Sequence, residues 1–94
     1  MTEFEWDEGK EIANIDKHGV SFHEAMLAFD DPLRIIELDT KHSEAEPRFH
    51  CYGYAGDDVM TVRFTYRGTA IRIFGAAYWR KGKKVYEKEQ KNQK

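Results

Sequence analysis

Residues 59–80 constrain the fold most, because two runs of β-branched and aromatic residues flank a tight turn in VMTVRFTYRGTAIRIFGAAYWR. Gly68 accepts the positive φ that tight hairpin turns require, so the pattern predicts a β-hairpin with Arg67-Gly68 as a two-residue loop. In this register Arg63 faces Arg72, Phe64 faces Ile71, Val62 faces Ile73 and Thr65 faces Ala70. Like charges placed opposite each other destabilise a sheet, so the arginine pair predicts a carboxylate or a bound anion nearby.

A further strand is expected before the hairpin. The segment RFHCYGY at 48–54 alternates in polarity, and a turn over 55–58 pairs Tyr54 with Val59, which places His50 opposite Arg63. The predicted apolar face carries Phe49, Cys51, Val62, Phe64, Ile71 and Ile73, and the polar face carries Arg48, His50, Tyr52, Thr61, Arg63, Thr65 and Arg72. A slip of one residue would mix the two sets, so their separation favours this register.

The first part of the chain carries helix signals. Asp7 is a typical N-cap, which predicts a helix over 8–17 that ends at Gly19, with Ile12 and Ile15 facing inward.

A second helix is expected directly afterwards. Ser21 and Glu24 have the spacing of a capping box, so this helix runs to about Phe29, before Asp31-Pro32. Residues 33–39 are a strand by composition, and 40–47 are a polar loop.

Together these elements predict one α+β domain over residues 1–94 in the order α-α-β-β-β-β-α, with a four-stranded antiparallel sheet and the helices packed on its apolar face. Residues 2–6 form either a brief strand or a segment that packs its aromatic rings on the core. The last helix is expected over about 83–91, because Gly82 weakens its start, and residues 91–94 are expected to fray.

The charge of the chain is divided between its halves. Residues 1–47 carry 4 Lys and Arg against 13 Asp and Glu, whereas residues 48–94 carry 11 against 4. Either the halves neutralise each other, or the basic half offers an anion-binding surface. Cys51, the single cysteine, cannot form an intrachain disulfide and is expected to pack in the core. The charged N-terminus and the lack of a long apolar run predict a soluble cytoplasmic protein without a membrane segment.

The polar sheet face is the first candidate for function. Guanidinium groups suit phosphate, and aromatic rings can stack on unpaired bases, so this face predicts RNA or phosphate binding by Arg48, His50, Tyr52 and Arg63. The basic segment after the hairpin extends this prediction to Lys81, Lys84 and Tyr86. The alternative is that Glu37, Glu44 or Glu46 pairs with the arginines.

The loop at 40–47 is the candidate source of acid and base groups. His42, Glu44 and Glu46 precede the arginine-bearing strand, and a carboxylate or imidazole beside arginines suits phosphoryl transfer without a metal. The alternative is an ordinary solvated loop. The chain has no zinc-ligand spacing and no glycine-rich phosphate loop, so neither a metal site nor a cofactor is expected.

The chain resembles the BrnT-type toxins. The segments K-H-G-V-S-F and F-T-x-R-G…I-R-I carry most of the likeness, which extends in order to about Tyr86. The matching residues are Phe4-Glu5-Trp6-Asp7, Lys10, Asn14, Lys17-His18-Gly19-Val20-Ser21-Phe22, Glu24-Ala25, Phe29-Asp30-Asp31-Pro32, Glu46, Arg48, Phe64-Thr65, Arg67-Gly68 and Ile71-Arg72-Ile73.

The resemblance implies the toxin half of a bacterial type II toxin–antitoxin pair, with a RelE-like fold and endoribonuclease activity on mRNA that inhibits growth. It also implies a BrnA-like antitoxin partner with a ribbon-helix-helix domain, and binding to operator DNA only through that antitoxin. The alternative is a non-catalytic subunit whose arginine face docks the antitoxin.

The expected catalytic set combines the resemblance with the acid and base candidates, as Glu46, Arg67, Arg72, Arg80 and His42. Similar toxins often carry S-A-R where this chain has Gly75-Ala76-Ala77, so an arginine is missing at position 77. Either Arg80 replaces that arginine from the following turn, or catalysis is weaker than in similar toxins.

Overall fold

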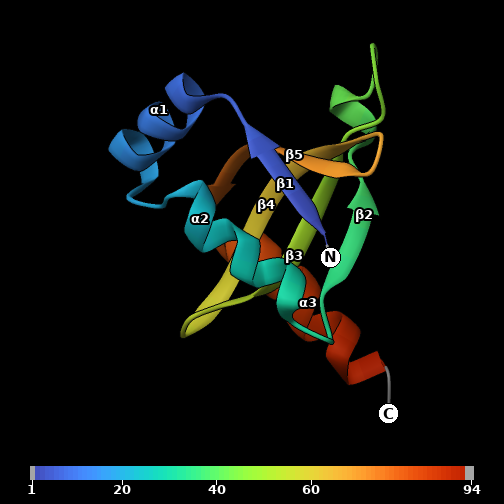
Figure 1. Cartoon of the computed structure of the whole chain (residues 1–94). Helices are drawn as coiled ribbons and strands as arrows, with labels where there is room; N and C mark the ends of the chain where they lie inside the picture. The colour runs from blue at the N-terminus through green and yellow to red at the C-terminus, as the bar shows by residue number, and fades with distance from the viewer. Residues whose placement is uncertain (1, 93–94) are drawn as a thin grey trace.

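The computed structural model describes residues 2–92 of the 94-residue chain as an α+β arrangement around one sheet (Figure 1). The elements in chain order are β1 (Glu3–Trp6), α1 (Glu8–His18), α2 (Phe22–Ala25), the 3-10 helix η1 (Met26–Asp30), β2 (Ile35–Leu38), the 3-10 helix η2 (Thr40–His42), β3 (Phe49–Ala55), β4 (Asp58–Arg67), β5 (Ala70–Ala77) and α3 (Arg80–Asn92). None of the helices described is long and apolar enough to cross a membrane.

The sheet has five strands in the order β1-β5-β4-β3-β2, so the prediction of four strands is wrong. The extra strand is β1, which runs parallel to β5 and pairs Phe4 with Ile71 and Trp6 with Ile73. The other neighbouring strands are antiparallel, as expected. The sequence of residues 2–6 could not distinguish a strand from a segment that packs its rings on the core. The reason is that β1 is short and its partner strand β5 lies far away in the sequence.

The register of β3 against β4 is confirmed. His50 pairs with Arg63 and Cys51 with Val62, as the short turn between the strands predicts. Cys51 is fully buried, and burial raises the pKa of its thiol to about 12, which fits a core residue rather than a nucleophile.

The register of the β4–β5 hairpin is shifted from the prediction, because the loop is Gly68-Thr69 and Arg67 pairs with Ala70. Gly68 still provides the positive φ, at 59°. Further along, Phe64 pairs with Ile73, Thr65 with Arg72 and Arg63 with Gly75. The two arginines therefore do not face each other, and the predicted cost of that pairing does not arise.

The expected separation of sheet faces survives this shift, because the pairing moved by an even number of residues near the turn. The apolar face packs against α1, α2 and η1, and the core there includes Phe22, Cys51, Val62, Phe64 and Ile73. An irregularity in the ladder lies between Arg63 and Phe64, opposite Phe74. This leaves Phe74 as an extra residue on β5.

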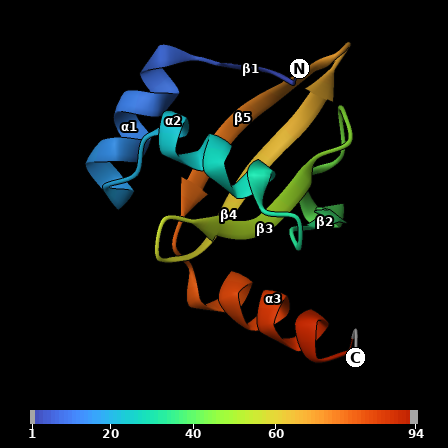
Figure 2. The same cartoon turned by 60° about the horizontal axis from the view of Figure 1, so that its bottom comes forward.

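The helices cover both faces of the sheet, so their predicted placement on one face is wrong (Figure 2). Helix α3 packs on the opposite face from α1 and α2, where Tyr86 joins Tyr52 and Val59 in a second buried cluster. The helix begins at Arg80 instead of 83 and continues through Lys91 and Asn92, where fraying was expected. Residues 93–94 lie outside the described part of the chain.

Gly82 explains why α3 can lie so close to the sheet. A Cβ at this position would lie only 1.9 Å from Thr61 Oγ1 and 3.0 Å from Tyr52 Cδ1. The glycine that weakens a helix in isolation is therefore the residue that allows α3 to dock.

Helix α1 has the predicted caps, with Asp7 accepting from the Lys10 amide and Gly19 in the left-handed region. Its predicted inward face is wrong, however, since Ile12 is 67% and Ile15 45% exposed. The buried residue is Asn14, whose side chain donates to the Val20 and Ala76 carbonyls and accepts from the Ala76 amide. The capping box of α2 is confirmed.

Candidate active site

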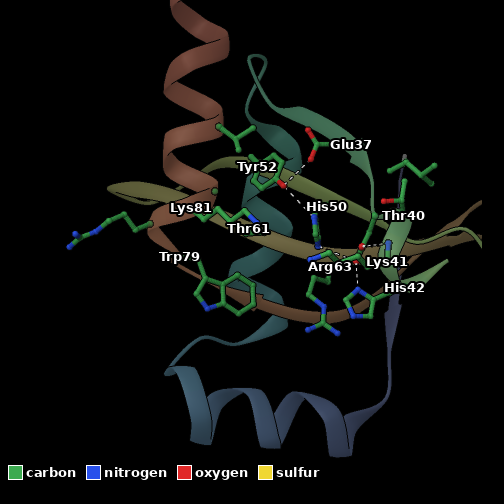
Figure 3. A pocket seen from close by; sticks show the side chains of 15 residues that line it. Glu37, Thr40, Lys41, His42, His50, Tyr52, Thr61, Arg63, Trp79 and Lys81 are labelled. Atoms are coloured by element: carbon green, nitrogen blue, oxygen red, sulfur yellow. Dashed lines mark hydrogen bonds and ion pairs between the residues drawn. The ribbon is translucent and has the colours of Figure 1, made fainter.

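A cavity of about 630 Å³ lies over β3 and β4, between the start of α3 and the end of β2 with η2 (Figure 3). We call it the histidine cavity. Its titratable lining residues are Glu37, Asp39, Lys41, His42, His50, Tyr52, Arg63, Arg80 and Lys81. Groups that can transfer protons and groups that can bind phosphate thus share one recess.

Asp39 connects the two imidazoles of this cavity. Its Oδ2 atom lies 2.8 Å from His42 Nδ1 and 3.4 Å from His50 Nε2. As the N-cap of η2 it also accepts a hydrogen bond from the Lys41 amide. Burial raises the pKa of Asp39, but the hydrogen bond from His42 and the charges of both imidazoles outweigh it and leave the pKa below its usual value. Asp39 is therefore an anion that orients imidazole rings.

His42 is the more accessible of the two imidazoles, with a side chain 58% exposed. When His42 Nδ1 donates to Asp39, the tautomer is fixed and Nε2 is left as an acceptor. An oriented imidazole with a free acceptor nitrogen is the arrangement that a general base requires.

His50 lies deeper and is held from both sides. Its Nδ1 atom lies 3.3 Å from the Tyr52 hydroxyl, which is also 3.3 Å from Glu37 Oε1. Burial lowers the pKa of His50, and the carboxylate of Asp39 opposes that only in part. Burial and the charge of Glu37 raise the pKa of Tyr52 to about 12. His50 thus has no nitrogen left for substrate unless one of these contacts breaks.

Arg63 and Trp79 both line the side of the histidine cavity that faces α1 (Figure 3). The guanidinium of Arg63 lies over Gly75, and a Cβ built on that glycine would be 3.9 Å from Arg63 Cζ. Arg63 and Trp79 also line a second, smaller cavity next to α1. A half-buried guanidinium beside an indole ring can hold a phosphate and a stacked base.

Comparison with known proteins identifies a family for this chain. A family model for the ribonuclease toxin BrnT of type II toxin–antitoxin systems matches residues 6–82. The chain belongs to the BrnT family. The crystal structure of the Brucella abortus ribonuclease toxin BrnT is similar, with a TM-score of 0.64 and 26% identity over 84% of this chain and 97% of that chain. A comparison with curated proteins finds no significant match.

The family match confirms the resemblance read from the sequence, and a BrnT-family ribonuclease toxin of a type II system implies an antitoxin partner. The match ends at position 82, so it includes the first residues of α3 that line the histidine cavity.

The BrnT-family toxin brings six of the sequence-predicted site residues together in the histidine cavity. They are His42, His50, Tyr52, Arg63, Arg80 and Lys81. Arg48 lines the second cavity instead. Lys84 is exposed on α3 and lines neither cavity, while Tyr86 is only 5% exposed and donates its hydroxyl to Asp31. Tyr86 is therefore a packing residue in this structure.

The three remaining predicted residues lie in ion pairs outside both cavities. Arg67 Nη2 lies 3.3 Å from Glu46 Oε2, and Arg72 Nη1 lies 2.8 Å from Glu5 Oε2. The alternative in which Glu46 pairs with an arginine is thus seen, though for Arg67. Each pair leaves its guanidinium less free to bind phosphate.

Sequence reasoning did not single out Asp39 or Trp79. The signal for Asp39 was its position three residues before His42 at the start of a short helical turn, a typical capping spacing. Ala77, where similar toxins often carry arginine, is 4% exposed and pairs with Thr61 beside the histidine cavity. Arg80 lines that same cavity.

Proposed function

We propose that this BrnT-family toxin is a metal-independent endoribonuclease that cleaves mRNA in the histidine cavity and thereby inhibits translation and growth. The observation that carries the proposal is the 2.8 Å contact between His42 Nδ1 and Asp39 Oδ2, in a cavity that also contains Arg63. Within residues 2–92 no group of three or more His, Cys, Asp or Glu side chains is placed to hold a metal ion. The proposed chemistry uses side chains alone.

In the proposed reaction His42 is the general base. Its Nε2 atom takes the proton of an RNA 2′-hydroxyl, and the 2′ oxygen forms a bond to the adjacent phosphorus. The bond from phosphorus to the 5′ oxygen breaks, and that oxygen takes a proton from the imidazolium just formed. The products are a 2′,3′-cyclic phosphate and a free 5′-hydroxyl, so atoms and charge balance.

Cationic side chains of the same cavity support this reaction. Arg63 stabilises the charge that develops on the phosphorane oxygens. Arg80 and Lys81, at the start of α3, bind the phosphate backbone of the RNA. Trp79 offers a ring on which a base can stack. His50 and Tyr52 hold Asp39 and the floor of the cavity in place.

The first experiment compares two histidine variants on a single-stranded RNA. His42→Ala is expected to lower cleavage by about 100-fold or more, because general base catalysis typically contributes that much. His23→Ala is the matched control, since His23 is exposed on α2 and lines neither cavity. Gel analysis of end-labelled products with EDTA present also tests metal independence.

The outcomes separate the enzyme from a non-catalytic antitoxin-binding subunit. If the wild-type chain leaves RNA and bacterial growth intact on induction, the enzyme proposal fails. If the wild type cuts and His42→Ala cuts equally well, RNA cleavage stands but the assignment of the base fails. In that case Glu46, the other predicted base, is the next residue to replace.

The proposed partner is a ribbon-helix-helix antitoxin that neutralises the toxin in the cytoplasm. The complex would bind operator DNA through the antitoxin. Co-purification of the neighbouring gene product, followed by RNA cleavage with and without it, tests this part separately from the chemistry.

A further inference from the structure

The second cavity, of about 310 Å³, lies between α1 and the sheet, and its lining includes basic but no acidic side chains. We call it the lysine cavity. Its ionisable lining residues are Lys10, Lys17, His18, Arg48 and Arg63, and no Asp or Glu lines it. Most of these groups come from α1, which the acid–base assignment above does not use.

The cations of the lysine cavity are not neutralised by the protein. Throughout residues 2–92, no carboxylate forms an ion pair with Lys10, Lys17, Arg48 or Arg63. The arginines near the hairpin turn, by contrast, have carboxylate partners. Like charges gathered in a recess with low-dielectric walls create a positive potential that an anion would relieve.

An aromatic ring contacts two of these cations, Lys10 and Arg48, and leaves their charge available. Phe74 is the extra residue on β5 at the irregularity in the β4–β5 ladder. Arg48 Cζ lies 4.3 Å and Lys10 Nζ 5.1 Å from the centroid of its ring. Across the cavity the His18 ring meets Trp79 edge to face at 5.3 Å. A cation–π contact positions a charged group without the neutralisation that a carboxylate brings.

The lysine cavity is adjacent to the histidine cavity, because Arg63 and Trp79 line both. We infer that the lysine cavity binds the phosphate of the nucleotide next to the cleaved one, so that the toxin holds single-stranded RNA over two consecutive phosphates. The inference rests on the proposed ribonuclease function. Ammonium and guanidinium groups with flanking rings are the set that binds a single-stranded backbone.

The direct test measures binding to a single-stranded DNA oligonucleotide, which lacks the 2′-hydroxyl and resists this cleavage. The double variant Lys10→Gln, Lys17→Gln removes two exposed cations from α1 and keeps good helix formers. Fluorescence anisotropy is expected to show affinity lowered by about tenfold at low salt, and a slope of log K against log salt that is shallower by about 0.7, the value for one phosphate contact on a single strand.

The matched control is Lys88→Gln, Lys91→Gln, which removes the same charge from an exposed part of α3 outside both cavities. Affinity is expected to fall by less than about threefold in this control. Equal losses in the two double variants would mean that only bulk charge matters, and the inference would be wrong.

A second measurement uses RNA substrates of different length. For a long oligonucleotide the Lys10→Gln, Lys17→Gln variant should raise KM and leave kcat nearly unchanged. For a dinucleotide, which has a single phosphodiester, KM should match the wild type. A KM raised equally for both substrates contradicts a flanking-phosphate site.

Two other results are informative. If the variant binds DNA like the wild type but loses affinity for an Asp- and Glu-rich peptide, the cavity docks a protein and the inference is overturned. If the wild type and control bind DNA, the variant does not, and no RNA is cut by any of them, the phosphate site stands while the proposed ribonuclease function fails.

Discussion

His50 shows at the scale of one residue how burial affects both stability and site geometry. In the unfolded chain a histidine has a pKa near 6.5, and burial in the folded protein lowers it. Asp39 and Glu37 oppose this shift, whereas Arg63 and His42 add to it. The unfolded chain therefore takes up a proton at a higher pH than the folded one.

The sign of the pH effect follows from this difference. Stability due to neutral His50 is complete above about pH 6.5 and is lost as the pH falls through the folded pKa. Urea unfolding at about pH 7.5 and about pH 5.5 should show a smaller loss for His50→Gln than for the wild type. Asp39, with its lowered pKa, stays ionised across this range. An equal loss in both proteins would contradict the half-buried, neutral state of His50.

Much of the candidate site was predictable one residue at a time, because arginine, histidine and tyrosine on one sheet face already indicated phosphate chemistry. Which of those residues form ion pairs with carboxylates was not predictable from the sequence. Arg67 and Arg72 carry the same chemistry as Arg63, and only the fold places carboxylates beside the first two. Asp39 was missed because an acidic residue before a polar loop has no local feature that distinguishes a cap from a site residue.

At the scale of elements, local signals were reliable and distant contacts were not. The caps of α1 and α2 and the β3–β4 register depend on residues a few positions apart, and all were predicted. The parallel β1 and the face on which α3 packs depend on contacts across most of the chain. The hairpin register failed by a small step because either of two adjacent residue pairs around Gly68 can form the loop.

Gly82 provides the test at this scale. Gly82→Ala should favour an isolated helix by about 1 kcal/mol, yet we expect it to lower the free energy of unfolding by about 1–3 kcal/mol. The reason is the 1.9 Å approach of the new Cβ to Thr61 Oγ1. Thermal and urea unfolding measure the effect, with Lys88→Ala as a control for helix propensity on the same helix.

A double-mutant cycle shows whether this contact is responsible. Thr61 Oγ1 is buried without a hydrogen-bond partner among the described residues. Thr61→Ala therefore removes the atom that would clash with the new Cβ and breaks no hydrogen bond. Gly82→Ala should be less destabilising in that background, although Tyr52 Cδ1, at 3.0 Å, still resists the methyl group. Additive effects would place the cause elsewhere in α3.

On the scale of the whole molecule, the acidic first half and basic second half meet in two ways. Glu5 with Arg72 and Glu46 with Arg67 join the halves through ion pairs around the β4–β5 turn. The lysine cavity instead collects cations from α1 and the sheet without carboxylates. Neutralisation between the halves is therefore seen at this turn, whereas an anion-binding surface on the basic half stays a prediction.

This division gives opposite expectations for arginines that look alike in the sequence. Arg72→Gln should reduce stability, because Arg72 joins β5 to Glu5 on β1, and should leave RNA cleavage within about twofold of the wild type. The pair is partly exposed, so a double-mutant cycle with Glu5→Gln should give a coupling of about 0.2–1 kcal/mol. Arg63→Gln should lower kcat strongly with a smaller effect on unfolding. If Arg72→Gln abolishes cleavage in a protein that unfolds like the wild type, the catalytic role predicted from the sequence is correct and Arg72 must leave Glu5 to reach the substrate.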